Sequence, residues 1–234
     1  MAEIRNHIMA RENFIIAIDG FSSCGKSTIA KALAKKLNFV FVDSGAMYRA
    51  VTLYFLRHKV DCTDQRAVLA ALEEIHIDFV PNTDKVQIFL NNEDVSEDIR
   101  KMEISDNVSE VSAIKEVRQA MVSQQQKLGQ KRNIVMDGRD IGTTVFPDAD
   151  LKIFMTADPN VRAERRYAEL TAKGEQVTME EVKANLAHRD HIDSTRAESP
   201  LRQAQDAVVL DNSELNQSQQ LDFVVDLYTK LSNR

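Results

Sequence analysis

The octapeptide Gly-Phe-Ser-Ser-Cys-Gly-Lys-Ser at residues 20–27 decides the fold of this chain. It fits the pattern G-x-x-x-x-G-K-[ST], a loop whose backbone amides surround phosphate groups. An apolar run at residues 14–18 precedes the loop and suits a buried parallel strand. A run at residues 26–37, rich in Ala, Lys and Leu, follows it and suits an amphipathic helix. Because a helix N-terminus supplies unpaired amides and partial positive charge, this order favours a phosphate-binding loop over a glycine-flanked turn that matches by chance.

The side chains of the loop predict its ligand. Lys26 is expected to contact the β- and γ-phosphates of a nucleoside triphosphate, and the Ser27 hydroxyl is expected to coordinate Mg²⁺. The predicted triphosphate site consists of Gly20, Ser22, Ser23, Cys24, Gly25, Lys26, Ser27 and Thr28.

The composition limits the class of protein. The chain has 234 residues, of which 43% are hydrophobic and 28% charged, and its net charge is −6. These values suit one α/β domain or a core with insertions, and they argue against a protein that holds nucleic acid polymers, which usually has a basic face. Cys24 and Cys62 are far apart, which suits a reducing compartment. Since no run of ~18 apolar residues occurs and residues 1–13 are polar, we expect a cytoplasmic protein without a membrane span.

Strands and helices alternate along the rest of the chain. Strands are predicted at residues 14–19, 39–43, 133–138, 150–155 and 208–211, and helices at 46–58, 105–129, 160–172, 178–190 and 214–232. We therefore expect an α/β fold with a parallel sheet of about five strands wrapped by helices, and ligands at the carboxyl ends of the strands. Residues 75–80 and 85–90 alternate in part around a turn at 81–84, which predicts a hairpin in a small inserted subdomain.

A second motif, Asp-Ser-Gly-Ala-Met-Tyr-Arg at residues 43–49, follows the second predicted strand. Ser44 is suited to cap the next helix. Tyr48 and Arg49 come about one turn later, where they could reach an anion near the helix start. The alternative is an ordinary helix cap followed by a surface tyrosine and arginine.

A third motif, Asp-Gly-Arg-Asp-Ile-Gly at residues 137–142, also follows a strand. A buried acid such as Asp137 suits Mg²⁺ binding. Arg139 stands between Asp137 and Asp140, so we expect it to be held firmly and to remain cationic, as stabilisation of a phosphoryl transition state requires. The alternative is a structural turn held by ion pairs.

Arginines also gather in the second half of the chain. Arg189, Asp193 and Arg196 share one face of a helix if the helix continues that far. Upstream, Arg162, Arg165 and Arg166 occur within one helical stretch. In an acidic chain, such clusters suit polyphosphate ligands, although a solvated helix face would explain any one of them.

Together these motifs resemble the cytidylate kinase family, over residues 15 to about 210. The most specific run is Asp-Gly-Arg-Asp-Ile-Gly-Thr-Thr-Val-Phe-Pro at residues 137–147, and the hairpin resembles an insert that ends at residues 93–100. The resemblance implies a P-loop NTPase fold with a core at residues 14–60 and 109–234, an insert that binds nucleoside monophosphate at 61–108, and a helical lid at about 158–190. It also implies a monomeric enzyme that transfers the γ-phosphoryl group of ATP to CMP or dCMP.

The resemblance further implies roles for individual residues. The catalytic residues would be Lys26, Asp137, Arg139 and Arg189, with Ser27 and Asp137 on Mg²⁺. Ser44, Tyr48, Arg49 and Arg139 would hold the CMP phosphate. Ser109, Arg118 and Asp140 would bind the cytosine edge, and Asp193 and Arg196 the ribose. Arg162, Arg165 and Arg166 would close over ATP.

Other functions remain open at this stage. A UMP/CMP or adenylate-type kinase would use the same fold. A GTP-dependent switch would carry an [NT]-K-x-D element, and the second half of the chain has none. A nucleotide-binding module without catalysis would not need the three acceptor-type motifs.

The loop departs from the commonest family sequence at three positions. Phe21 replaces proline, Ser23 replaces glycine and Cys24 replaces alanine. Ser23 raises the question of whether the backbone keeps the family geometry. Cys24 is either a reactive thiol at a helix N-terminus or a small buried side chain.

Overall fold

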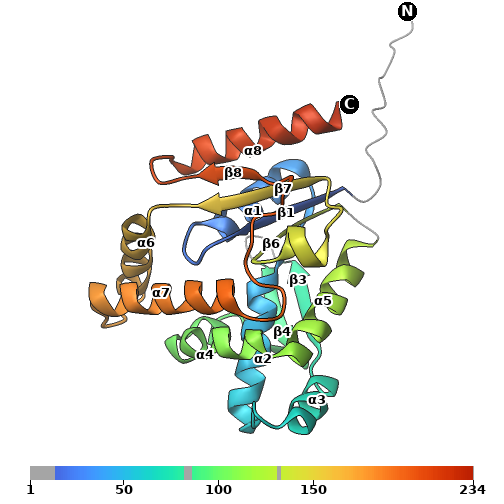
Figure 1. Ribbon diagram of the computed structural model, residues 1–234, viewed down its shortest axis with the longest axis vertical. Helices are drawn as coiled ribbons and strands as arrows, with labels where there is room; N and C mark the ends of the chain where they lie inside the picture. Colours follow the sequence, from blue (N-terminus) through green and yellow to red (C-terminus); the bar gives the residue numbers. More distant parts are fainter. Residues whose placement is uncertain (1–13, 82–85, 131–132, 234) are drawn as a thin grey trace, which may run out of the picture.

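The main sheet consists of five parallel strands in the order β2-β6-β1-β7-β8 (Figure 1). The computed structural model describes residues 14–81, 86–130 and 133–233. The strands are β1 (Ile15–Gly20), β2 (Val40–Asp43), β6 (Ile134–Gly138), β7 (Leu151–Thr156) and β8 (Val208–Asp211). The predicted α/β class and the five predicted strands are confirmed, because each run differs from its observed strand by no more than one residue at either end.

Both faces of the central strand are covered. Ile16 and Ile18 are fully buried and pack with α1 (Lys26–Leu37) and α8 (Gln217–Ser232) on one face. Ala17 points to the other face, where it packs with Ile141 of the π-helical turn η2 (Ile141–Val145). Since successive side chains of a strand alternate between faces, a continuous apolar run is what a strand in this position requires.

The predicted helix at 105–129 is two helices. α4 (Met102–Ala113) ends at Ile114, whose backbone is extended (φ −65°, ψ 126°), and α5 (Lys115–Gly129) begins directly after it. Val111 and Val117, on either side of the break, pack into one apolar cluster. The apolar periodicity therefore continues across the break and could not reveal it. The other helices are α2 (Ser44–His58), α3 (Gln65–Glu73), α6 (Pro159–Ala172) and α7 (Met179–Thr195).

A second, antiparallel sheet contains β3 (Ile77–Pro81), β4 (Val86–Leu90) and β5 (Glu93–Asp94). The predicted hairpin is confirmed, whereas its turn at 81–84 falls mostly outside the described residues. The short strand β5, the helix α3 and the 3-10 turn η1 (Asp98–Arg100) were not predicted. Arg57 of α2 holds this region through Glu93 (2.7 Å) and Asp98 (2.9 Å).

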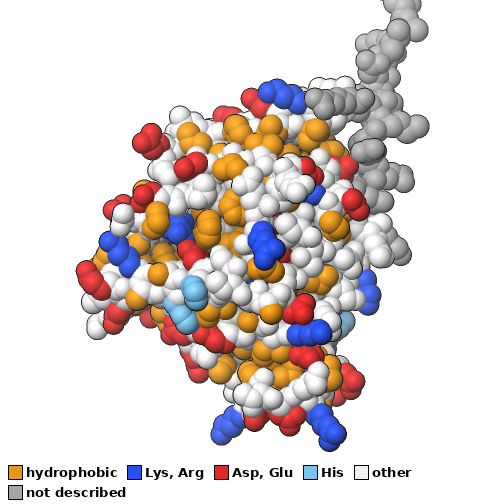
Figure 2. Space-filling view, viewed as in Figure 1, with side chains coloured by type: hydrophobic (Ala, Val, Ile, Leu, Met, Phe, Trp, Pro, Cys, Tyr) orange, Lys and Arg blue, Asp and Glu red, His pale blue; other side chains and the backbone are white. Residues whose placement is uncertain are grey.

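The surface mixes charged and apolar side chains. Figure 2 shows acidic, basic and apolar atoms interspersed over one face. Among the helices that the structure describes, none is both long enough and apolar enough to cross a membrane.

Candidate active site

The phosphate loop lies between the end of β1 and the start of α1. Gly20 has φ +149°, and a Cβ there would lie 2.0 Å from the Met155 carbonyl oxygen, so only glycine fits. Gly25 has φ +88°. Ser23 has φ +57°, in the left-handed region that glycine adopts most readily. The chain thus keeps a glycine-like backbone at Ser23 although the side chain differs from the family's commonest residue.

Lys26 and Cys24 point inward beneath the loop. Lys26 Nζ donates to the Phe21 carbonyl oxygen at 2.6 Å, and its pKa is lowered by burial and by the nearby Arg139. Cys24 is fully buried and its Sγ donates to the same carbonyl at 3.0 Å. Of the two readings of Cys24, the buried packing residue is the one that the structure supports.

Ser27 and Asp137 form the pair predicted to bind metal. Ser27 Oγ donates to Asp137 Oδ2 at 2.7 Å, whereas Asp137 Oδ1 is buried and has no hydrogen-bond partner among the described residues. Burial raises the pKa of Asp137 to about 7, and repulsion from Asp43 adds to the rise. An unpartnered carboxylate oxygen beside a hydroxyl fits Mg²⁺, which prefers oxygen ligands and binds through few protein groups together with phosphates.

The start of α2 differs from the prediction in one respect. Asp43, not Ser44, caps the helix, since its carboxylate accepts from the Ala46 amide at 2.9 Å. Ser44 is the first helical residue, and its hydroxyl donates to the Asp137 carbonyl oxygen at 2.6 Å. This bond links α2 to the end of β6. The predicted capping role of Ser44 is wrong, because Asp43 accepts the capping hydrogen bond.

Tyr48 and Arg49 face the interior rather than solvent. Tyr48 is 7% exposed, and Arg49 donates to Ser105 Oγ at 3.0 Å and to the Ile99 carbonyl oxygen at 3.3 Å. Burial lowers the pKa of Arg49 to about 10. The alternative of a surface tyrosine and arginine is therefore excluded.

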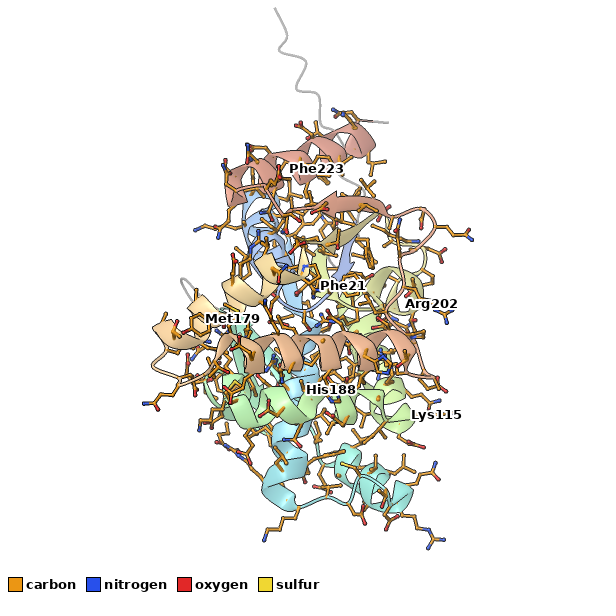
Figure 3. All side chains as sticks on the ribbon, turned by 60° about the vertical axis from the view of Figure 1, so that its left-hand side comes forward. Phe21, Lys115, Met179, His188, Arg202 and Phe223 are labelled. Atoms are coloured by element: carbon orange, nitrogen blue, oxygen red, sulfur yellow. The ribbon has the colours of Figure 1, made fainter. Side chains whose placement is uncertain are left out.

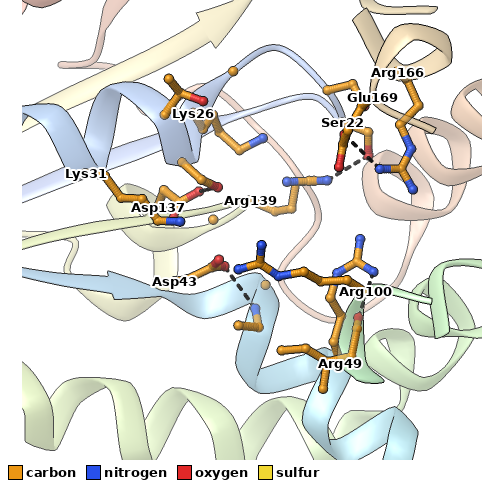
Figure 4. Close-up of a pocket in the computed structure, with 18 of the residues that line it drawn as sticks. Ser22, Lys26, Lys31, Asp43, Arg49, Arg100, Asp137, Arg139, Arg166 and Glu169 are labelled. Atoms are coloured by element: carbon orange, nitrogen blue, oxygen red, sulfur yellow. Dashed lines mark hydrogen bonds and ion pairs between the residues drawn. The ribbon is translucent and has the colours of Figure 1, made fainter. Parts of the chain in front are cut away.

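Arg139 bridges the loop and the helix α7. Its Nε donates to Asp193 at 2.8 Å, and a terminal nitrogen donates to Ser22 Oγ at 2.7 Å (Figure 4 shows the Ser22 contact). Burial acts to lower the pKa of Arg139, but the negative groups around it, with Asp193 first among them, together raise it. Arg139 is cationic, as predicted. The ion pair that holds it involves Asp193, 54 positions away, instead of the neighbours Asp137 and Asp140.

A small cavity of about 60 Å³ lies behind Arg139. Arg118 binds Asp140 there at 2.5 Å and stacks over the Tyr48 ring at 5.2 Å. All nine predicted acceptor-side residues line this cavity together: Ser44, Tyr48, Arg49, Ser109, Arg118, Arg139, Asp140, Asp193 and Arg196.

A larger cavity of about 360 Å³ joins this pocket to the phosphate loop (Figure 4). Positive charge dominates its lining. The basic residues are Lys26, Lys31, Arg49, Arg100, Arg139, Arg166, Lys173 and Arg189, against the acids Asp43, Asp137 and Glu169. Such a concave cationic lining suits two phosphorylated ligands that meet end to end.

The three arginines predicted to close over the triphosphate do not line the same cavity. Arg165 and Arg166 line a third cavity of about 510 Å³ between the loop and the start of α8. Arg162 lines none of these three cavities and donates instead to Asp190 and to the Ser22 carbonyl oxygen.

Sequence reasoning missed Asn212 in the third cavity. Its amide donates to the Cys24 carbonyl oxygen at 2.7 Å, and it accepts from Arg165 at 2.9 Å. Asn212 directly follows β8, so its place after a predicted parallel strand was the signal that could have identified it.

The family model and the curated relatives agree on one family. The family model for cytidylate kinase matches residues 16–230. A cytidylate kinase of Bacteroides fragilis is 52% identical over 220 residues, covering 92% of this chain and 96% of that protein. One of Cytophaga hutchinsonii is 51% identical over 218 residues, covering 92% and 93%. An uncharacterised protein of Eubacterium ventriosum has a similar fold, with a TM-score of 0.54, 12% identity, and coverage of 94% of this chain and 99% of that one. With its motifs, its parallel sheet and these relatives, the chain belongs to the cytidylate kinase family.

Proposed function

We propose that this protein transfers the γ-phosphoryl group of ATP to CMP or dCMP. The observation that carries the proposal is the position of Arg139, which contacts Ser22 of the phosphate loop and Asp193 of the acceptor pocket at once. A cation at this point would meet the phosphoryl group while it passes between the two nucleotides. The names of the curated relatives support cytidylate as the acceptor.

The reaction needs no general base, because a phosphate oxygen of CMP is already anionic at neutral pH. Catalysis then consists of alignment and charge neutralisation. Lys26 would leave the Phe21 carbonyl for the β- and γ-phosphates, and Arg49, Arg139 and Arg189 would hold the acceptor phosphate in line. Ser27 and Asp137 would hold Mg²⁺, which when bound neutralises charge on the triphosphate.

Recognition of the acceptor is assigned to the small cavity. Cytosine presents an exocyclic amine that donates and ring atoms that accept. Asp140 and Ser109 would accept from the amine, and Arg118 would donate to the ring. The Arg118–Asp140 pair is only 3% and 4% exposed, so its orientation is held before the base arrives. Asp193 and Arg196 would contact the ribose.

The wider assignments belong to the same proposal. Residues 61–108 would form the acceptor insert, and about 158–190 a lid that brings Arg165 and Arg166 over ATP. The boundary at 108 falls inside α4, which spans Met102–Ala113. We expect the enzyme to be cytoplasmic and monomeric. Sedimentation velocity with and without nucleotides would test the oligomeric state.

The decisive experiment measures ADP release with ATP, Mg²⁺ and one nucleoside monophosphate at a time. We expect kcat/KM for CMP and dCMP to exceed that for UMP and AMP by at least about 100-fold, since a site built for one hydrogen-bonding edge leaves buried groups unpaired with another base. Arg118→Met should lower kcat/KM for CMP and reduce this preference. Equal rates with UMP or AMP would favour the related kinases, and ADP release that no monophosphate stimulates would contradict the proposal.

A further inference from the structure

Ser22, at the tip of the phosphate loop, is tied through three different atoms. Its amide donates to Asp190 Oδ1 of α7 at 3.2 Å. Its carbonyl oxygen accepts from Arg162 of α6 at 3.2 Å. Its hydroxyl accepts from Arg139 at 2.7 Å. Ser22 is only 2% exposed, so these contacts are formed away from bulk water.

Arg162 and Asp190 also bind each other. Arg162 donates to Asp190 Oδ2 at 2.5 Å, and the two side chains are 8% and 16% exposed. A second nitrogen of Arg162 donates to the Ala157 carbonyl oxygen at 3.3 Å. The Ser22 amide and carbonyl thus meet a carboxylate and a guanidinium that are already paired, which makes the arrangement a closed ring of hydrogen bonds.

Phe21 strengthens the same contact. The Arg162 guanidinium lies over the Phe21 ring, 5.3 Å from its centroid. The Phe154 ring of β7 packs edge-on against Phe21, with the two centroids 5.9 Å apart. Figure 3 shows Phe21 between the sheet and α7. Phe21 is one of the positions where this chain departs from the commonest loop sequence, and the cation–π contact with Arg162 depends on its aromatic ring, which a proline there would not supply.

We propose that Arg162 and Asp190 form a clamp that positions the tip of the phosphate loop from α6 and α7, so that Arg162 acts on phosphoryl transfer through Ser22 and not by contact with ATP. The inference rests on the proposed function, because it assigns a role within that reaction. Three observations carry it. Nε and one terminal nitrogen of Arg162 donate to protein acceptors, and Arg162 lines none of the three cavities of the site. Its partner Asp190 is a carboxylate, which an anionic nucleotide does not favour.

The clamp has a mechanical consequence. The Ser22 hydroxyl accepts a hydrogen bond from Arg139, while the Ser22 backbone is hydrogen-bonded to α6 and α7. A movement of these helices therefore changes the position of the donor loop relative to the arginine at the transfer point. Since misplacement by about 1 Å costs about 100-fold in rate, the clamp should influence kcat more than the affinity for ATP.

A double-mutant cycle tests the clamp in the full-length enzyme. Arg162→Met, Asp190→Asn and the double variant are compared in kcat, KM for CMP and the equilibrium Kd for ATP, well below each Tm. We expect kcat to fall about 10- to 100-fold in each single variant. Because both residues act through one clamp, kcat of the double variant should fall no more than about threefold further. The Kd for ATP should change less than about threefold in every variant. A double variant whose loss is the product of the single losses would overturn the proposal. So would an Arg162→Met variant that loses ATP affinity while Asp190→Asn does not.

Amide hydrogen exchange gives a readout that needs no catalysis. In the protein without nucleotide, Asp190→Ala should increase exchange at the Ser22 amide, and Lys183→Ala, which removes an exposed lysine from the same helix, should leave it unchanged. Unaltered protection in Asp190→Ala, or lower Tm with normal kcat and normal exchange, would overturn the clamp. These outcomes are separate from failure of the proposed function, in which the unchanged protein releases no ADP with any monophosphate.

Discussion

Arg139 is the residue whose removal should cost the most at the transfer point. It links Ser22 of the loop with Asp193 of α7 and carries a charge stabilised by that pair. Arg139→Ala should lower kcat by at least about 100-fold, the order expected for loss of one stabiliser of transition-state charge, with ATP Kd changed less than about threefold. Steady-state kinetics and nucleotide titration measure the two quantities. Arg202→Ala, at an exposed position, is the matched control, and turnover equal to that control would refute the role.

Asp19 gives the fold a pH dependence. Its carboxylate accepts from the Ile141 and Gly142 amides at 2.8 and 2.7 Å, and burial raises its pKa from 3.8 to about 6. Between these values the native state binds more protons than the unfolded chain, so stability from this group is present below pH 4 and is lost as pH rises through 6.

The test compares urea unfolding of the unchanged protein and Asp19→Asn at several pH values. Relative to the variant, the unchanged protein should lose up to about 3 kcal/mol of unfolding free energy between pH 4 and pH 7, since each pKa unit corresponds to about 1.4 kcal/mol. Titrating groups that do not interact with Asp19 cancel in this difference. A difference that does not change with pH would contradict the assignment.

Single residues show where sequence reasoning stops. The types and local order of Lys26, Ser27 and Asp137 predicted that they lie together at one site, because each follows a strand or opens a helix. The partners of Arg139 and Arg162 could not be read from the chain, since Asp193 and Asp190 reach them only through the packing of α7. Adjacent carboxylates in sequence were the wrong guide for Arg139. Asp137 faces Ser27 and Asp140 faces Arg118.

At the scale of elements, the junction of β6 with α2 controls the site. A Cβ on Gly138 would lie 2.5 Å from Ser44 Oγ and 2.7 Å from the Ile141 side chain. Gly138→Ala should therefore displace the Ser44–Asp137 bond, lower unfolding free energy by about 2 kcal/mol or more, and reduce kcat. Gly174→Ala is the control. Gly174 has φ +83° with no atom within 4 Å of an added Cβ, so that variant should lose only about 1 kcal/mol and keep its turnover. Urea denaturation and steady-state kinetics measure the unfolding free energy and kcat of both variants. Equal losses in the two variants would exclude the steric explanation.

Elements with a regular apolar pattern were located well, whereas the break at Ile114 and the elements without such a pattern were not predicted. The helix at residues 26–37 matches α1, because the loop fixes its start and its apolar stripe is regular. β5 has two residues and both are exposed, so it carries no apolar pattern. The cap of α2 was misplaced by one residue because Asp43 and Ser44 are both good caps, and only the structure shows that Asp43 accepts from the Ala46 amide.

For the whole molecule, the site concentrates positive charge in a chain of net charge −6. Arg189 shows the cost of this concentration. Burial lowers its pKa to about 9, repulsion from Arg49 and Arg139 adds to the effect, and its buried Nε has no hydrogen-bond partner within the described part of the chain. This concentration of positive charge therefore opposes folding, and anions that bind in the cavity should stabilise the protein by linkage.

Tripolyphosphate and Arg189→Met test this balance. At about 100 times its Kd, the anion should contribute about 2.7 kcal/mol, which corresponds to a rise in Tm of roughly 5–10 °C for a chain of this size. Arg189→Met should raise the Tm of the free protein by roughly 2–4 °C, because it removes repulsion and an unpaired buried donor, and it should at least halve the rise that tripolyphosphate causes. Scanning calorimetry at constant ionic strength, with sodium chloride in place of the anion as control, measures both shifts. A variant with a lower Tm and an undiminished response would mean that Arg189 stabilises the fold and takes no part in holding phosphate.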